Sequence, residues 1–310
     1  MKRCARGILI TSAVLLSLLV WGPDARGIDD NIVKSSAQDS IPPIELVRAA
    51  VANEVAASND ASLKQMFRSR RQTPQGSQTR LYVETLDAMA GMTIAYNDNP
   101  LTPEQMRGEE GRLAALVGNP EQLKRKRSQE LEAAERTLRI VKALPGAFSF
   151  EYDGEEVGTA GLGKERSRLV RLKFRPNPEY QPPSRVEQVL VGMQGAVLID
   201  SAAQRIARID GTLFKDVSFG WGFLGHLDKA GHFLVEQREV GEGTWAISRM
   251  SLSFTGKILF FKSIAIKSDE VFSDFRRVPG DTTFAQGVEL LKAEAAKSGT
   301  AAASADGKAH

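Results

Sequence analysis

The sequence has little of the residues from which most catalytic and metal sites are built. Its 310 residues include one cysteine, Cys4, and three histidines. A single cysteine cannot form an internal disulfide, so the core alone must stabilise the fold. The G-x-S-x-G turn that surrounds many serine nucleophiles does not occur either. We therefore expect a protein that is not an enzyme and that needs neither a cofactor nor a metal ion.

The chain also lacks a strong charge of either sign. The formal net charge is +3, and residues 1–27 contribute four basic residues and one acidic residue to it. The rest of the chain is neutral and offers no overall field to attract nucleic acid. A basic cluster, Lys124 to Arg127, is followed closely by glutamates and contains no aromatic residues on which bases could stack. We expect no nucleic-acid partner.

Long apolar runs are missing except near the start. Residues 8–21 are uncharged, three basic residues precede them, and Ala25-Arg26-Gly27 follows with small residues suited to cleavage. This pattern predicts a signal peptide over residues 1–27, and therefore an exported, periplasmic protein. The run is shorter than the roughly 20 residues of a membrane span. A retained anchor is the alternative, and a lipid anchor is not expected because no cysteine follows the run.

The remaining chain predicts one domain. Residues 28–43 are polar, end in two prolines and are expected to be a linker, and residues 44–297 form the domain. Apolar residues at helical spacing predict a helix over Ile44 to Ala57 and a closing helix over Thr283 to Lys297. In the closing helix we expect Phe284, Val288 and Leu291 to point inward. Ser298 to His310 is small and polar, so we expect a disordered tail.

A helical insertion is predicted over residues 102–144. Two segments in it open with the same signal, Thr102-Pro103-Glu104-Gln105 and Asn119-Pro120-Glu121-Gln122. Each offers an N-cap residue, a proline at the first helical position and a glutamine that can close a capping box. We expect helices from there to Val117 and to Leu144, where Pro145-Gly146 follows.

Alternation of apolar and polar residues predicts strands elsewhere, and glycine-rich Asp153 to Arg166 is expected to be a mobile loop. The fold class is therefore α+β, with an antiparallel sheet and several helices. The predicted strands are Leu63–Thr73, Thr79–Leu86, Met92–Tyr96, Ala147–Tyr152, Leu169–Phe174, Val186–Val191, Ala196–Asp200, Arg205–Leu213, Lys215–Gly220, His232–Val240, Thr244–Phe254 and Ile258–Val271.

The most apolar stretch is Trp245 to Lys267, which we interpret as a hairpin with a turn at Thr255-Gly256. In that register Leu252 faces Leu259 and Met250 faces Phe261. Both faces of the second arm need cover, which a helix or a lipid-sized ligand would supply. The predicted ligand site therefore has a wall of Met250, Leu252, Phe254, Leu259 and Phe261.

Phe219 to Gly225 alternates large apolar residues with glycines. Two interpretations stay open: a hydrophobic loop folded into the core, or a flexible gate with Trp221 and Phe223 at the mouth of the site. Nearby, His226, Asp228 and His232 have a spacing that could suggest a metal. Because glycines surround them and the spacing fits no helix face, we expect a turn with two incidental histidines.

Two segments resemble motifs of the superfamily of periplasmic lipoprotein carriers and outer-membrane lipoprotein-sorting proteins. Ala196 to Asp210 resembles their W-I-D-x-x-x-x-R-x-x-R segment, and Gly243 to Arg249 resembles G-x-W-x-P-x-R. The chain departs from these patterns at Leu198 and Ile247 and in its longer helical insertion. Leu259 to Ile264 is shared with uncharacterised exported proteins of soil bacteria, the nearest likeness.

The resemblance implies an unclosed β-barrel with helices as a lid over an apolar cavity. It also implies a carrier or sensor of a lipid or of the acyl chain of a lipoprotein, which we expect to be a monomer. The alternative is a structural or interaction module of the cell envelope, with a filled core, no ligand and an envelope protein as partner.

Overall fold

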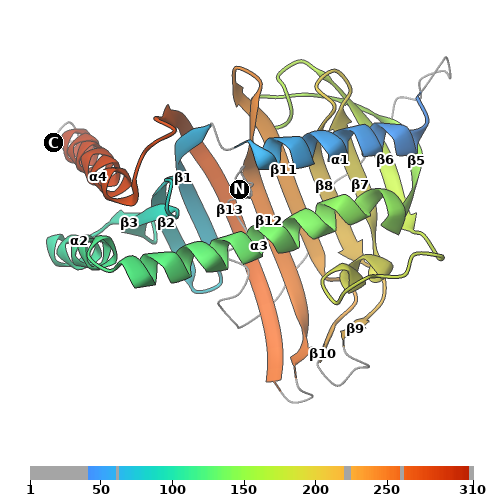
Figure 1. The fold of residues 1–310 in the computed structure, drawn as a ribbon, viewed down its shortest axis with the longest axis horizontal. Helices are drawn as coiled ribbons and strands as arrows, with labels where there is room; N and C mark the ends of the chain where they lie inside the picture. The colour runs from blue at the N-terminus through green and yellow to red at the C-terminus, as the bar shows by residue number, and fades with distance from the viewer. Residues whose placement is uncertain (1–40, 61–62, 220–224, 259–261, 307–310) are drawn as a thin grey trace. The chain divides into compact units, whose positions relative to one another are not determined.

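The computed structural model describes residues 41–60, 63–219, 225–258 and 262–306 (Figure 1). None of the helices in these ranges is long and apolar enough to cross a membrane. The elements are α1 (Pro43–Asn59), β1 (Lys64–Thr73), β2 (Gly76–Val83), β3 (Ala90–Tyr96), β4 (Asn99–Pro100), α2 (Pro103–Val117), α3 (Pro120–Ala147), β5 (Phe148–Val157), β6 (Arg168–Pro176), η2 (Glu187–Gly192), β7 (Met193–Asp200), β8 (Arg205–Leu213), β9 (Val217–Phe219), β10 (Gly225–Leu227), β11 (His232–Gly241), β12 (Thr244–Ile258), β13 (Lys262–Val278) and α4 (Phe284–Asp306).

The strands described are antiparallel and belong to one sheet. Their hydrogen-bonded order is β4-β3-β2-β1-β13-β12-β11-β8-β7-β6-β5, and β10 joins β12 to β9 beside this path. The first and last strands of this order do not pair with each other, so the sheet is not closed into a barrel. The predicted α+β class with an unclosed antiparallel sheet is confirmed.

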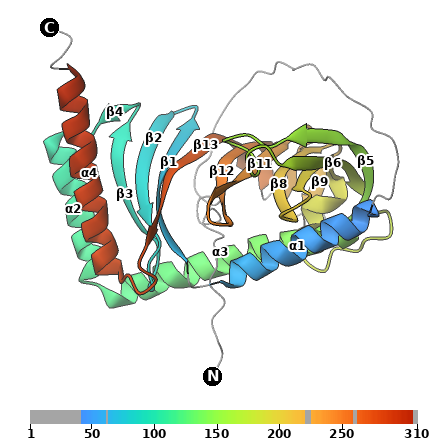
Figure 2. The same ribbon diagram turned by 90° about the horizontal axis from the view of Figure 1, so that it is seen from above.

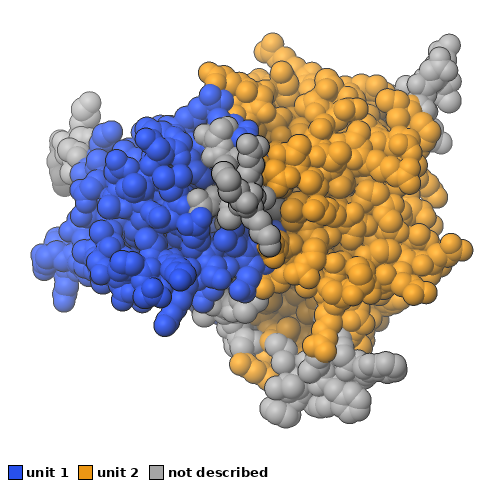
Figure 3. Space-filling view, viewed as in Figure 1, with its two compact units in different colours: residues 1–7, 60–134, 270–310 blue, residues 8–59, 135–269 orange. Residues whose placement is uncertain are grey.

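The chain divides into two compact units (Figure 3). Among the described residues, unit 1 contains 60–134 and 270–306, and unit 2 contains 41–59 and 135–269. Each unit therefore combines segments that are distant in the sequence. Both units draw residues from the range 44–297, which the sequence analysis treats as one domain. The two units are described separately below.

The core of unit 2 lies between its sheet and α1, which runs along one face of strands β5 to β8 (Figure 2). The apolar stripe of α1 supplies Leu46, Val47, Ala50 and Val51, and all four are buried. They join one cluster with residues of β5 to β8 and of the C-terminal end of α3. Burying a leucine or valine completely contributes about 1.5–3 kcal/mol. The helix is thus an integral part of the core.

The core of unit 1 lies between strands β1 to β3 and the helices α2 and α4. As predicted, Phe284, Val288 and Leu291 of α4 point inward, and all are buried in one cluster with β2 and β3 residues. At Gly287 an added Cβ would lie 2.7 Å from Thr85 Cγ2, so only glycine allows this close approach. The helix continues to Asp306, so Ser298 to Asp306 is helical and not part of a disordered tail.

Side chains satisfy the open edge of β3. The carboxylates of Glu109 on α2 and Glu130 on α3 accept hydrogen bonds from the backbone N–H groups of Thr93 (2.7 Å) and Met89 (3.0 Å). Arg112 donates to the carbonyl oxygen of Gly91 (2.7 Å). Strand β4 pairs only with the last two residues of β3, so these side chains take the place of a neighbouring strand.

The predicted turn at Thr255-Gly256 is wrong, because β12 runs through it to Ile258. Gly256 pairs with Leu227 of β10, and an added Cβ there would lie 2.2 Å from the carbonyl oxygen of His226. The glycine permits close approach of two backbones within a strand and does not form a turn. Leu259 and Phe261, which we expect to face Leu252 and Met250, lie outside the described ranges.

Several other elements differ from the prediction, of which three are instructive. The predicted strand Val186–Val191 is the 3-10 helix η2, in which Glu187 accepts a hydrogen bond from the Ser184 hydroxyl group. Helix α3 contains Pro145 and ends at Ala147. Strand β5 extends to Val157, into the segment expected to be a loop. In each case a local signal was overridden by tertiary contacts or by pairing with a neighbouring strand.

Candidate functional site

Three residues of the predicted cavity wall are described, and they occupy alternate positions of β12. Met250 and Leu252 are buried and stand opposite Val235 and Phe233 of β11. Phe254 is half-buried and packs against the core cluster of unit 2, which also contains the four buried residues of α1. The face that carries Phe254 is therefore packed by the chain's own side chains.

The other four predicted ligand residues are not described. Trp221 and Phe223, expected at the mouth of the site, and Leu259 and Phe261, expected in its wall, lie outside the described ranges. The assignment of these seven residues to a ligand site stays a prediction. None of the three described members lines either of the two grooves considered below.

An open groove of about 760 Å³ lies in unit 1 along the neighbouring helices α2 and α4. We call it the α2–α4 groove. Most of its contact surface comes from small and aliphatic side chains of the two helices. Its lining residues are Ala114, Val117, Pro279, Asp281, Thr282, Ala285, Gln286, Val288, Glu289, Leu290 and Lys292.

Two aliphatic residues of this groove face solvent. Val117, at the end of α2, is 41% exposed, and Leu290, in the first half of α4, is 38% exposed. Lys292 lies at the rim and forms an ion pair with Glu289 at 2.8 Å. The groove thus combines an apolar surface with a polar rim, as small-molecule sites do. Sequence reasoning missed it because the spacing of apolar residues marks Leu290 only as part of a helix, not as exposed.

Two buried carboxyl groups belong to the sheet of unit 1. Glu84 accepts a hydrogen bond from the N–H of Gln65 at 2.9 Å, and burial raises its pKa to about 7. Glu270 accepts a hydrogen bond from the Ser69 hydroxyl group, and burial raises its pKa as well. A carboxyl group with a pKa near 7 could act as a general acid. Neither residue lines one of the two grooves described here.

The histidines of the H-x-D-x3-H pattern do not converge. His226 pairs with Asp228 at 3.2 Å, whereas His232 pairs with Asp210 of β8 at 2.8 Å. The hydrogen bond with Asp210 raises the pKa of His232. Within the described ranges no group of three or more potential metal ligands comes together. Asp228 also accepts a hydrogen bond from the Thr255 hydroxyl group, which holds the loop before β11 against β12.

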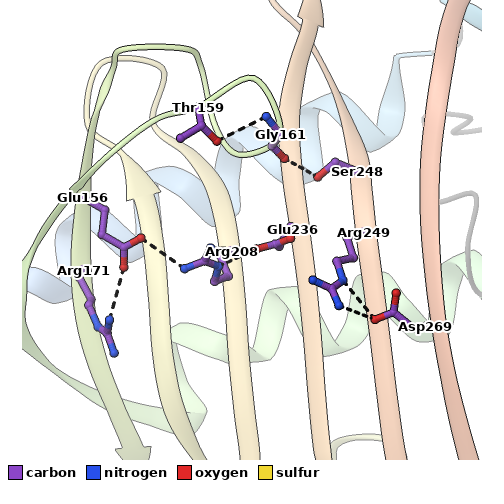
Figure 4. A network of polar contacts seen from close by, with 9 residues as sticks. All are labelled: Glu156, Thr159, Gly161, Arg171, Arg208, Glu236, Ser248, Arg249 and Asp269. Carbon is purple, nitrogen blue, oxygen red and sulfur yellow. Dashed lines mark hydrogen bonds and ion pairs between the residues drawn. The ribbon is translucent and has the colours of Figure 1, made fainter. Parts of the chain in front are cut away.

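A row of alternating charges crosses the sheet of unit 2 (Figure 4). Arg249 pairs with Asp269 at 2.7 Å, and Arg208 pairs with Glu236 at 2.8 Å. In the strand register Glu236 lies directly opposite both Arg249 and Arg208. A slip of one residue would set these charges on the opposite face, so the row helps to fix the register.

The row continues across a gap at β7. Leu198 stands between Arg208 of β8 and Arg171 of β6 in the register. Glu156 of β5 spans this position, because its two carboxylate oxygens each lie 3.3 Å from one of the two guanidinium groups (Figure 4). The charges of the row neutralise one another, so it offers no free charge to a ligand.

The glycine-rich segment after β5 is held against the sheet. Gly163 donates to the carbonyl oxygen of Gln237 at 2.8 Å and accepts from the N–H of Glu239 at 3.1 Å. Ser248 donates from its hydroxyl group to the carbonyl oxygen of Gly161 at 2.8 Å (Figure 4). The expectation of a mobile loop is corrected by these contacts, which its glycine content does not reveal.

Comparison with known proteins gives few matches. No family model matches the sequence, and no curated protein does. A crystal structure of a DUF1329 family protein from Desulfovibrio piger is similar in structure, with 9% sequence identity and a TM-score of 0.24. The alignment covers 76% of this chain and 94% of that chain.

Proposed function

We propose that this protein is exported and binds a lipid or an acyl chain, such as that of a lipoprotein, as a carrier or sensor without catalysis. The α2–α4 groove is the observation that supports this proposal. Its volume of about 760 Å³ falls within the roughly 300–1,000 Å³ of small-molecule sites. Its apolar surface suits a hydrocarbon chain, and the polar rim suits a headgroup. The resemblance of two sequence segments to periplasmic lipoprotein carriers supports the same function.

The two exposed aliphatic residues of the groove allow their contribution to the binding free energy to be calculated. Val117 and Leu290 are 41% and 38% exposed, so a covering chain would remove about two fifths of each side chain from water. Complete burial of such a side chain contributes about 1.5–3 kcal/mol, so each residue should contribute about 0.6–1.2 kcal/mol to binding. Together they correspond to about a tenfold to fiftyfold change in affinity.

The test is a titration of the full chain with a fluorescent fatty acid. A variant with Val117→Gln and Leu290→Gln has a good helix former at both positions but places amides against the ligand. We expect its dissociation constant to rise at least tenfold. The matched control is Val157→Gln, because Val157 is 67% exposed and lies at the end of β5 in unit 2. It should bind like the unmodified protein.

Two results would contradict the proposal. One is the absence of fatty-acid binding by the unmodified chain together with no lipid in its organic extract by mass spectrometry. The other is equal binding by the groove variant and by the Val157→Gln control, which would place the ligand elsewhere. In that case the predicted wall at Met250, Leu252 and Phe254 would be tested next.

A second candidate function is an interaction module of the cell envelope that has a filled core and no lipid ligand. The observation that favours it is α1, which packs four buried residues into the core of unit 2. A protein that extracts without lipid and binds no fatty acid, yet unfolds cooperatively, would support this candidate instead.

A further inference from the structure

A second groove, of about 360 Å³, lies in unit 2 over strands β6, β7 and β8. We call it the β6 groove. Gly195 and Ala196 line it from β7, and Ala196, which stands opposite Lys173 and Asp210 in the register, adds only a methyl group to that face of the sheet. Lys173 and Arg175 line it from β6, and they share a face because they are two residues apart in a strand. The groove is thus bounded by cations on the β6 side.

The charges around the β6 groove are unevenly compensated. Arg171 and Lys173 both pair with Asp153 of β5, at 3.1 Å and 2.5 Å. Asp210 of β8 pairs with His232. Arg175 is exposed, and no ion pair of its guanidinium group is present among the residues described.

Neutral hydrogen-bond donors complete the groove. Gln194 of β7 and Thr212 of β8 stand directly opposite each other in the strand register, and both line the groove. Within the described part of the chain, neither side chain makes a hydrogen bond. An amide, a hydroxyl group and a guanidinium group therefore line the same small volume without partners in the described ranges of the chain.

We propose that the β6 groove binds a phosphate group, either as a small free phosphate or as the headgroup of a phospholipid. A guanidinium group can donate two parallel hydrogen bonds to phosphate oxygens. The amide of Gln194 and the hydroxyl group of Thr212 can donate to the remaining oxygens. The carboxylate of Asp210, which also lines the groove, is hydrogen-bonded to His232 at 2.8 Å. This site is independent of the α2–α4 groove and of the lipid function proposed for it.

The experiment compares two sources of phosphate. The full chain is titrated with inorganic phosphate while the backbone amide signals of Gly195, Ala196 and Thr212 are followed by NMR. Co-sedimentation with phosphatidylglycerol vesicles, compared with phosphatidylcholine vesicles, tests the headgroup. The site variants are Arg175→Gln and Thr212→Val. The matched control is Arg168→Gln, which removes the same charge from β6 at a residue that pairs with Glu155.

We expect phosphate to shift the three amide signals, and Arg175→Gln to weaken binding about tenfold, the effect of losing one charge-assisted contact. Arg168→Gln should leave the affinity unchanged. Vesicle binding that Arg175→Gln abolishes would identify a lipid headgroup, whereas binding of free phosphate alone would identify a small soluble ligand. Equal weakening by Arg175→Gln and Arg168→Gln would overturn the proposal, because it would indicate attraction by net charge alone. So would the absence of binding in both arms.

Discussion

The largely buried ion pair between Glu54 and Arg205 should anchor α1 to the sheet of unit 2. The two carboxylate oxygens of Glu54 accept hydrogen bonds from Arg205 Nε and Nη2 at 2.8 and 3.0 Å. The first oxygen also accepts from the N–H of Ile206 at 3.1 Å. Both side chains are only 13% exposed, and the guanidinium group lies 5.5 Å from the ring centroid of Trp245. The pair is therefore shielded from water and hydrogen-bonded in two directions.

Replacing Glu54 by alanine should lower the free energy of unfolding by about 3 kcal/mol. Removing one partner of a buried ion pair costs roughly 3–5 kcal/mol, because the other charge stays buried and unpaired. The remaining exposure of Arg205 places the expected loss at the lower end of that range. Urea denaturation followed by circular dichroism would measure it on the full chain.

The same helix offers a matched control. Glu45 pairs with Arg48 at 2.6 Å, but these side chains are 51% and 59% exposed. An exposed pair of this kind contributes about 0.3–0.5 kcal/mol, so Glu45→Ala should change stability by no more than that. Equal losses for Glu54→Ala and Glu45→Ala would refute the reasoning, since burial would then have no effect on the strength of the pair.

Two further predictions concern unit 1. Phe67 is buried, and its ring centroid lies 5.3–6.1 Å from those of Tyr82, Phe272 and Phe275. Phe67→Ala should therefore lower the free energy of unfolding, measured in urea, by about 3–5 kcal/mol. A loss under about 1 kcal/mol would mean that the ring is not packed. Burial raises the pKa of Glu84 from 4.5 to about 7, so the folded state binds the carboxyl proton more tightly than the unfolded state does. The free energy of unfolding should therefore fall by about 3 kcal/mol as the pH rises from about 4.5 to 7. Glu84→Gln should remove this fall when the free energy of unfolding is measured as a function of pH. If the variant and the unmodified protein show the same pH profile, the prediction is wrong.

Local signals predicted the helices that begin with a cap. Thr102 accepts a hydrogen bond from the N–H of Gln105 and the Gln105 side chain accepts from the N–H of Thr102, as the capping box requires. Asn119 likewise accepts from the N–H of Gln122 at 3.0 Å. These contacts lie within four residues of sequence, so no tertiary information was needed to expect them.

Features that depend on distant residues could not be predicted in the same way. Gly256 looks like a turn residue in the sequence, but its role is set by the approach of β10, about thirty residues earlier. The α2–α4 groove depends on how two helices, separated by α3 and most of the sheet in sequence, lie together. Apolar periodicity places Val288 on the inward face of its helix, but it does not show that Leu290 lines a groove shared with another helix.

The side chains along the edge of β3 also decide where the sheet stops. Burial alone would raise the pKa of Glu109, but hydrogen bonds from Arg112 and from the N–H of Thr93 outweigh it and hold that pKa below its ordinary value. The carboxylate therefore keeps its charge, and its hold on the strand, in mildly acidic surroundings. Sheet growth from this side would need another copy of the chain to displace two helices at once. An unclosed sheet can in this way remain finite at its β3 end, where the chain's own side chains occupy the positions that a strand from another copy would need.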